Sequence, residues 1–227
     1  MCNLLFKLKE SRSIEPSLIV TSRVLQIDRL CFRYPHRAVF TDWSASIPSG
    51  VTLVRGGEGV GKTTLLRLMA GDLAPDQGEL QINGIHLRDH PVAYQRQVFW
   101  VDVRSEAFDQ LTPTAYFASL YERYPAFDQV ALAGSIEGLS LTPHLDKNLY
   151  MLSTGSKRKV WLAAAFAAGA TVTVLDDPFA ALDKGSIGFV MGFLDKMATH
   201  STRAWVISHY DVPCSAPLAA VIDLGDE

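Results

Sequence analysis

Cysteines are scarce in this sequence, which argues against a disulfide framework. Only three occur among the 227 residues, Cys2, Cys31 and Cys214. Their odd number and their lack of metal-ligand spacing favour reduced thiols in a cytosolic compartment. Stability must then come from an apolar core, and a composition of 48% hydrophobic residues suffices for one domain, or for one domain with a subdomain.

Long apolar runs and a large excess of one charge are also missing. No segment offers about 18 uninterrupted apolar residues, the length that a membrane-spanning helix needs. The apolar run at residues 4–6 is too short for the core of a signal peptide. The net charge of −3 creates no global basic field. We therefore expect a soluble protein that requires a spanning partner for any work at a membrane.

The order of apolar patterns predicts an α/β protein. Residues 24–34 alternate apolar and polar side chains, which indicates a half-buried strand, whereas residues 111–168 follow a helical pattern. Continuous apolar strands are typical of a sheet covered on both faces. The other expected elements are strands within residues 51–54, 78–87, 97–103, 171–177, 204–209 and 218–224, and helices within 61–71 and 187–197.

Two adjacent carboxylates end one of these apolar runs. Asp176 and Asp177 follow residues 171–175 and precede Pro178. Acids at the end of a strand often serve only as loop residues or helix N-caps. Alternatively, the two acids bind a cation. In that case another part of the chain should bind a group that requires the cation.

A glycine-rich segment, GGEGVGKTT, supplies that part. It matches the pattern Gly-x4-Gly-Lys-Thr between an apolar strand and a helix. Glycines bring backbone N–H groups against phosphate oxygens, the lysine neutralises phosphate charge, and the threonine hydroxyl after it can bind Mg²⁺. A glycine-rich turn without a ligand is the alternative, but the lysine, the threonine and both flanks fit a nucleotide. The predicted nucleotide-binding residues are Gly56, Gly57, Glu58, Gly59, Val60, Gly61, Lys62, Thr63 and Thr64.

The phosphate loop and the paired acids together predict a site for ATP and Mg²⁺. Asp176 fits the Walker B acid that holds Mg²⁺ opposite Thr63. The long interval between Lys62 and Asp176 leaves room for an inserted domain. A minimal nucleotide kinase has no need of such an insertion.

The sequence LSTGSKRKV, residues 152–160, resembles the signature of the ATP-binding cassette (ABC) ATPases. That signature is usually Leu-Ser-Gly-Gly-Gln, and it lies at the same interval before the Walker B aspartate. The sequence DDPFAALD, residues 176–183, resembles the family's Walker B acid, catalytic acid, proline and D-loop. The sequence VISH, residues 206–209, resembles its switch-histidine strand. The resemblance runs from about residue 24 to about residue 224.

The resemblance implies a fold and a domain organisation. The fold is α/β, a P-loop NTPase core with a mixed sheet, an N-terminal antiparallel β-subdomain and an inserted α-helical signature subdomain. The implied organisation is an N-terminal extension at residues 1–22 and an ABC ATP-binding domain at residues 23–227, with the helical subdomain at about 104–168.

The resemblance also implies how the cassette works. Two cassettes meet head to tail, and each ATP lies between one chain's phosphate loop and Ser153 and Gly155 of the other. A homodimer and a heterodimer with another cassette both satisfy this arrangement. Membrane-spanning transporter subunits are the implied partners, and they would hold the chain on the cytoplasmic face of the membrane.

Single residues gain roles from the same resemblance. Tyr34 stands at the adenine-stacking position, and Asp183 is the D-loop aspartate that organises the dimer. The implied catalytic residues are Lys62, Asp177 in the place of the catalytic acid, and His209 in contact with the γ-phosphate. An ordinary core aromatic and a satisfied strand-end histidine are the alternatives for Tyr34 and His209.

Several positions depart from the family pattern. Thr154 and Ser156 replace the usual glycine and glutamine of the signature. The family's loop glutamine is expected near Asp102 or Val103 and is missing, so Asp102 is the candidate substitute ligand. Asp177 stands where the family carries glutamate, which predicts slow hydrolysis.

An ATP-hydrolysing subunit of an ABC transporter is the first functional hypothesis. Soluble ABC proteins of DNA repair or translation usually carry paired cassettes or long insertions, which this sequence lacks. A regulatory module with little turnover is the third hypothesis, since the loop glutamine and the catalytic glutamate are both replaced. The compact chain resembles small export-type cassettes, including the haem-exporter subunit of cytochrome c maturation. The basic run at residues 157–159 is interpreted as a solvated helix face, so no nucleic acid is expected.

Overall fold

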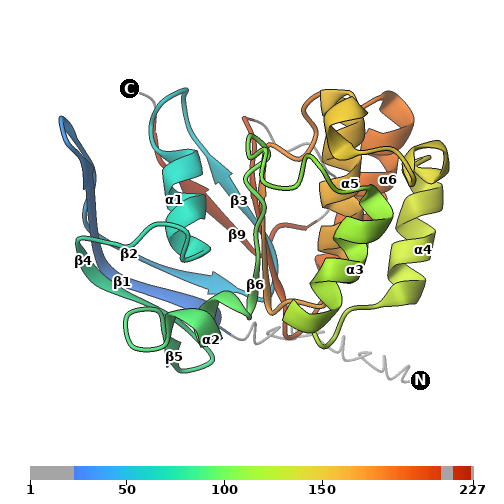
Figure 1. The fold of residues 1–227 in the computed structure, drawn as a ribbon. Coiled ribbons are helices and arrows are strands. Elements are labelled where there is room, and N and C mark those ends of the chain that lie inside the picture. Colours follow the sequence, from blue (N-terminus) through green and yellow to red (C-terminus); the bar gives the residue numbers. More distant parts are fainter. Residues whose placement is uncertain (1–22, 211–216, 226–227) are drawn as a thin grey trace, which may run out of the picture.

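Two β-sheets organise the fold, and a computed structural model describes them over residues 23–210 and 217–225 (Figure 1). The predicted N-terminal extension, residues 1–22, lies outside the described residues, as do Cys2 and Cys214. Cys31 carries a free thiol. The antiparallel sheet has the order β2-β1-β4-β5, with β1 Arg23–Tyr34, β2 Arg37–Pro48, β4 Gln77–Ile82 and β5 Ile85–His86. The parallel sheet has the order β6-β7-β8-β3-β9, with β3 Gly50–Arg55, β6 Val98–Phe99, β7 Val172–Asp176, β8 Ala204–Ser208 and β9 Ala220–Asp223.

The strand expected within residues 78–87 is a hairpin, formed by β4 and β5. Asn83 and Gly84 connect the two strands, and both have a positive φ, at 51° and 76°. Asn-Gly pairs favour this conformation, since asparagine tolerates positive φ and glycine has no Cβ to clash. The strand expected within residues 97–103 is also shorter than predicted, because only β6 pairs with β7.

Helix α1 (Lys62–Met69) lies between the two sheets (Figure 1). Its buried residues include Leu65, Leu66, Leu68 and Met69, which pack with apolar side chains from both sheets. The helix ends before Gly71, whose φ of 69° suits a residue without a Cβ. The short helix α2 (Pro91–Gln95) begins at a proline, where no intrahelical N–H is needed.

Four helices cover the opposite face of the parallel sheet (Figure 1). They are α3 (Pro113–Arg123), α4 (Gln129–Gly138), α5 (Thr154–Ala167) and α6 (Lys184–Met197), with 3₁₀ turns at Thr142–His144 and Leu149–Met151. Helix α6 begins earlier than predicted, because Asp183 caps it by accepting a hydrogen bond from the Ser186 N–H. Within the described residues, no helix has both the length and the apolar character needed to cross a membrane.

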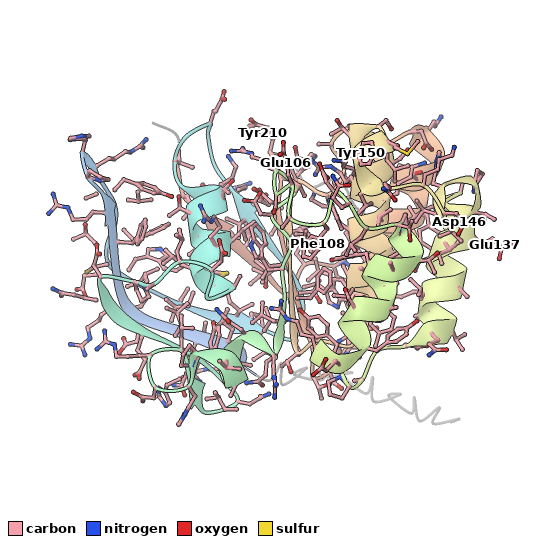
Figure 2. All side chains as sticks on the ribbon, viewed as in Figure 1. Glu106, Phe108, Glu137, Asp146, Tyr150 and Tyr210 are labelled. Atoms are coloured by element: carbon pink, nitrogen blue, oxygen red, sulfur yellow. The ribbon has the colours of Figure 1, made fainter. Side chains whose placement is uncertain are left out.

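Apolar side chains fill the space on both faces of the parallel sheet (Figure 2). Helix α5 lies at the centre of the helical layer, with residues 160–167 all buried. Phe108 and Tyr116 pack against Trp161 on this helix, with ring centroids 6.0 and 4.7 Å from it. The predicted α/β class with an N-terminal antiparallel sheet is therefore confirmed. The limits of the helical subdomain, at about 104–168, stay a prediction.

Candidate ATP-binding and hydrolysis site

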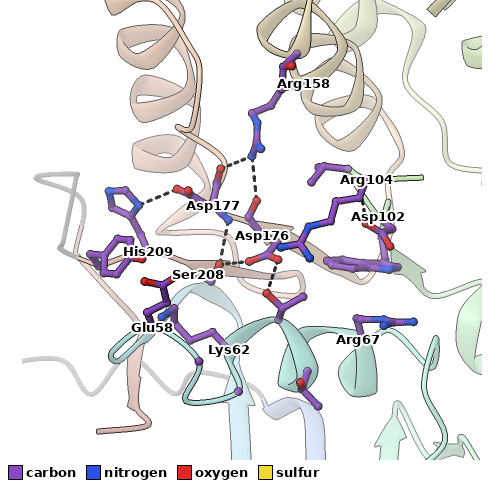
Figure 3. Close-up of a pocket in the computed structure, with 18 residues that line it drawn as sticks. Glu58, Lys62, Arg67, Asp102, Arg104, Arg158, Asp176, Asp177, Ser208 and His209 are labelled. Atoms are coloured by element: carbon purple, nitrogen blue, oxygen red, sulfur yellow. Dashed lines mark hydrogen bonds and ion pairs between the residues drawn. The ribbon is translucent and has the colours of Figure 1, made fainter. Parts of the chain in front are cut away.

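A cleft of about 620 Å³ opens at the carboxyl ends of β3, β7 and β8 (Figure 3). Ligands of open α/β sheets usually bind outside this edge of the sheet. Most predicted phosphate-loop residues and both acids contribute to the cleft. The lining residues are Glu58, Gly59, Gly61, Lys62, Thr63, Thr64, Arg67, Trp100, Asp102, Val103, Arg104, Thr154, Arg158, Asp176, Asp177, Ser208, His209 and Tyr210.

The loop between β3 and α1 requires its glycines. Gly56 has a φ of 145°, and Gly61, which precedes α1, has a φ of 112°. A Cβ on Gly61 would lie 2.6 Å from Val39 Cγ1, and one on Gly56 would lie 2.7 Å from the carbonyl oxygen of Gly225. Gly56, Gly57 and Val60 are outside the cleft lining. The loop therefore needs glycine at these two points, and the first N–H groups of α1, which have no intrahelical acceptors, follow directly after it.

Lys62 lies within the phosphate loop. Its Nζ donates hydrogen bonds to the carbonyl oxygens of Gly56 at 2.7 Å and Gly57 at 2.5 Å. Its Nζ also lies 5.0 Å from the centroid of the Tyr210 ring. A phosphate bound at this helix N-terminus would meet the lysine charge and the helix dipole together.

Asp176 contacts the predicted Mg²⁺ ligand Thr63. The Thr63 hydroxyl donates to Asp176 Oδ2 at 2.7 Å, and the Ser208 hydroxyl donates to Asp176 Oδ1 at 2.6 Å. A carboxylate and a hydroxyl beside a phosphate loop are hard oxygen donors, which are the ligands that Mg²⁺ prefers. The residues present therefore fit an Mg²⁺ ion bound together with a nucleotide.

Asp177 and His209, the other predicted catalytic residues, are neighbours in the cleft. Asp177 Oδ1 lies 3.1 Å from His209 Nδ1. Asp177 has a φ of 45°, which non-glycine residues seldom adopt, and its N–H donates to Ser208 Oγ at 3.0 Å. Ser208 is 1% exposed and was missed by sequence reasoning. The sequence feature that could have indicated Ser208 is a hydroxyl residue at the end of the apolar strand β8.

The interpretation of residues 157–159 as a solvated face is wrong. Lys157 Nζ donates to Asp109 Oδ1 at 2.6 Å, and both side chains are mostly buried. Arg158 Nη1 donates to the carbonyl oxygens of Asp176, at 3.1 Å, and of Asp177. Desolvation lowers the pKa of Arg158, and the charges of the two aspartates partly offset this effect.

Ser153, Gly155 and Asp183 lie outside the cleft lining. Ser153 caps α5 by accepting a hydrogen bond from the Ser156 N–H at 3.2 Å. Asp183 accepts a hydrogen bond from Lys159 Nζ at 2.6 Å, and this contact, with those from Ser186, holds the pKa of Asp183 below its usual range. These three residues thus do not line the cleft that contains the phosphate loop, although Thr154, between Ser153 and Gly155, does.

Tyr34 also lies outside the cleft lining, and Asp102 lies within it. Tyr34 is 41% exposed, and its hydroxyl lies 3.3 Å from Thr64 Oγ1 on the first turn of α1. Asp102 Oδ1 accepts a hydrogen bond from the Arg104 N–H at 2.9 Å. An exposed ring beside the loop and a carboxylate in the cleft keep both residues as candidates for nucleotide or metal contacts.

Comparison with known proteins identifies the family. The family model described as ABC transporter matches residues 40–180, more than half of the chain. The chain belongs to the ABC transporter family. A cytochrome c biogenesis ATP-binding export protein, CcmA, from Pseudomonas fluorescens (strain Pf0-1) is 28% identical over 211 residues, which cover 91% of this chain and 99% of the relative. A protein of the same name from Legionella pneumophila (strain Lens) is 30% identical over 194 residues, which cover 84% of this chain and 94% of that relative.

Solved structures of ABC proteins share the fold. An ATP-binding subunit of an ABC transporter has a TM-score of 0.73 at 21% identity, covering 82% of this chain and 79% of that one. A bacterial Atm1-family ABC exporter with ATP bound has a TM-score of 0.67 at 18% identity, covering 84% of this chain and 35% of that one. The predicted P-loop NTPase fold and the identification of the chain as an ABC nucleotide-binding subunit are confirmed.

Gly155 offers a test of how the ABC signature packs. A Cβ at Gly155 would lie 2.4 Å from the carbonyl oxygen of Ala181, so Gly155→Ala is expected to destabilise the cassette by about 1–3 kcal/mol. Gly188→Ala, within α6, is the matched control. Its Cβ would meet nothing within 4 Å, and alanine should stabilise a helix there by about 0.5–1 kcal/mol. Urea denaturation measures both changes, and a Gly155→Ala variant as stable as the wild type would contradict the tight contact.

Proposed function

We propose that this chain is the ATP-hydrolysing subunit that energises an ABC transporter through head-to-tail dimerisation of two cassettes. One observation carries the proposal. The phosphate loop, Asp176, Asp177 and His209 meet in one cleft, whereas Ser153 and Gly155 lie outside it. Of the signature segment, Thr154 and Arg158 line the cleft, so Ser153 and Gly155 of this chain stand beside its own phosphate site without lining it, and a second cassette would complete the enclosure.

ATP is expected to bind with its phosphates in the loop. Lys62 and the N–H groups at the start of α1 bind the phosphate oxygens, and the Tyr34 ring stacks against the adenine. Thr63 and Asp176 hold Mg²⁺, which neutralises charge on the β- and γ-phosphates when it is bound. Asp102 is the candidate for the oxygen ligand that the family's loop glutamine normally supplies.

Asp177 is proposed as the general base of hydrolysis. Its carboxylate accepts a proton from the water that attacks the γ-phosphorus, so that the new O–P bond forms as the bond to the bridging oxygen breaks. His209, which lies 3.1 Å from this carboxylate, orients it and binds the γ-phosphate. The first turn of α5, with Ser153 at its cap, would bind the same phosphate from the partner cassette.

An ATP-dependent dimer tests the proposal. Asp177→Asn removes the proposed base, so the bound ATP should survive and hold two cassettes together. Light scattering is expected to show twice the monomer mass of 24.9 kDa with ATP, and the monomer mass without it. Lys62→Ala combined with Asp177→Asn is the control that should stay monomeric. A strict monomer at every ATP concentration, both alone and with a second cassette from the same transporter, would count against the head-to-tail arrangement.

The transporter partners are proposed to span the membrane and to hold the chain on its cytoplasmic face. The relatives are named as ATP-binding export proteins of cytochrome c biogenesis, which favours an export-type transporter. The transported substrate is then determined by the membrane subunits. Affinity purification of the chain from solubilised membranes should recover such a subunit, whose identity would distinguish export from import.

A slow regulatory cassette is the second candidate. The observation in its favour is that Asp177 stands where the family carries glutamate, and that the family's loop glutamine, expected near Asp102 or Val103, is missing. Such a cassette would bind ATP and dimerise but would release almost no phosphate. Phosphate release by the assembled complex therefore separates the two candidates.

A further inference from the structure

Arg158 connects the signature helix to the acid pair of the same chain. It lies in the second turn of α5, and its Nη1 donates to the carbonyl oxygens of Asp176 and Asp177 (Figure 3). Its Nε is buried, and no hydrogen-bond partner for it lies among residues 23–210 and 217–225. A charged guanidinium forms strong hydrogen bonds. Because two main-chain oxygens accept from Arg158, these bonds restrain the backbone at Asp176 and Asp177 as well as the arginine side chain.

The neighbouring basic residues of α5 behave differently. Lys157 pairs with the carboxylate of Asp109, and Lys159 pairs with that of Asp183. These two lysines bind side chains, which can rotate without moving the backbone. Arg158 binds the backbone itself, at the two residues where β7 ends and the proposed chemistry begins.

The Arg158 contacts hold both peptide groups that flank the Cα of Asp177, because the Asp176 carbonyl belongs to the preceding group and the Asp177 carbonyl to the following one. Ser208 Oγ accepts from the Asp177 N–H on one side, and Arg158 Nη1 donates to the Asp177 carbonyl on the other. Between them, Asp177 has a φ of 45°, a conformation that persists where the surroundings impose it. The direction of the Asp177 side chain, and so its contact with His209, depends on both anchors.

We propose that Arg158 is a positioning residue for ATP hydrolysis, which aims the Asp177 carboxylate by holding the main-chain oxygens of Asp176 and Asp177. The inference rests on the proposed function, since it gives Asp177 the role of base. Helix α5 would then have two roles. Its N-terminus binds the γ-phosphate in the partner cassette, and its Arg158 positions Asp177 in its own chain. A movement of α5 would thereby change the direction in which the Asp177 carboxylate points.

The test compares Arg158→Ala, Arg158→Gln and Arg158→Lys in the assembled ATPase. Since a base displaced by about 1 Å loses up to about 10²-fold, Arg158→Ala should lower kcat by roughly 10- to 100-fold. The KM for ATP should stay within about twofold, because the phosphate loop is untouched. Arg158→Lys should recover part of kcat, since it keeps a charged donor, and Arg158→Gln should lie lower. Lys196→Ala, an exposed charge at the end of α6, is the control expected to match the wild type.

Hydrogen exchange of the peptide that spans residues 172–183 gives a readout independent of turnover. Loss of the anchor should accelerate exchange there in Arg158→Ala and leave the Lys196→Ala peptide unchanged. Wild-type kcat in both Arg158→Ala and Arg158→Gln overturns the inference, and so does a change in KM alone, which would mean that Arg158 binds nucleotide. If the wild type binds ATP without hydrolysing it, the proposed function fails. The hydrogen exchange of residues 172–183 is a separate test: if it is unchanged in Arg158→Ala, Arg158 does not hold this segment, and the inference fails as well. If Arg158→Ala does not fold, the glutamine and lysine variants decide by the same criteria.

Discussion

Replacing Lys62 with alanine is expected to weaken ATP binding strongly. Lys62 Nζ lies inside the phosphate loop, held by the carbonyl oxygens of Gly56 and Gly57. A triphosphate in the cleft would keep its other contacts, but the charge of the lysine would be lost. Removing one partner of a largely desolvated charge pair costs about 2–5 kcal/mol. The dissociation constant for ATP should therefore rise roughly 30-fold to several thousand-fold.

Isothermal titration calorimetry with ATP and Mg²⁺ measures this change directly. Lys196→Ala removes the same charge from an exposed position of α6 and should bind ATP as the wild type does. Thermal denaturation of Lys62→Ala should show an intact fold, because the partners of Nζ among residues 23–210 and 217–225 are loop oxygens and the exposed Tyr210 ring. Wild-type affinity in a folded Lys62→Ala variant would place the nucleotide elsewhere.

The phosphate loop could be predicted from sequence because its physics is local. A loop that aims N–H groups at phosphate needs glycine where φ is positive, and Gly56 and Gly61 fulfil that need in the structure. The contact between Thr63 and Asp176 joins distant segments, yet their motifs anticipate it. Each motif needs the same cation, and strands β3 and β7 both end at one edge of a parallel sheet.

Contacts that depend on packing could not be predicted in the same way. Residues 157–159 read as an exposed basic run, but α5 is apolar on all sides from residue 160 onward. Such a helix lies at the centre of its layer, so its polar first two turns are also surrounded by neighbours. The apolar segment LAAAFAAG, residues 162–169, indicated that the helix is buried. Strand β6 ends early for a related reason, since Trp100, Asp102 and Val103 leave the sheet edge and line the cleft.

Replacing Asp177 with glutamate is expected to accelerate ATP hydrolysis by roughly tenfold or more. Aspartate has the chemistry of the family's glutamate but is one methylene shorter, which withdraws its oxygens by about 1.5 Å. A misplacement of about 1 Å can cost about 10²-fold, and a positioned general base contributes about 10²- to 10⁴-fold in total. Much of the catalytic contribution of the base is thus expected to be missing from the wild type.

The backbone around Asp177 leaves little room to compensate for the short side chain. Ser208 holds its N–H and Arg158 holds its carbonyl oxygen, so the Cα is fixed from both sides. The reach of the carboxylate is then set by the length of the side chain alone. Glutamate at this position should extend past the contact with His209 toward the γ-phosphate held by Lys62.

Single-turnover hydrolysis of ATP by the assembled complex is the appropriate measurement, because it separates the chemical step from product release. Asp177→Glu should be faster than the wild type, and Asp177→Ala should be slower, since it removes the remaining base. Asp177→Asn keeps the size of the side chain without its basicity and should resemble Asp177→Ala. If Asp177→Glu is instead slower than the wild type while it binds ATP normally, the anchors at Ser208 and Arg158 have built the site around aspartate, and the shorter acid is the correct length for this cassette.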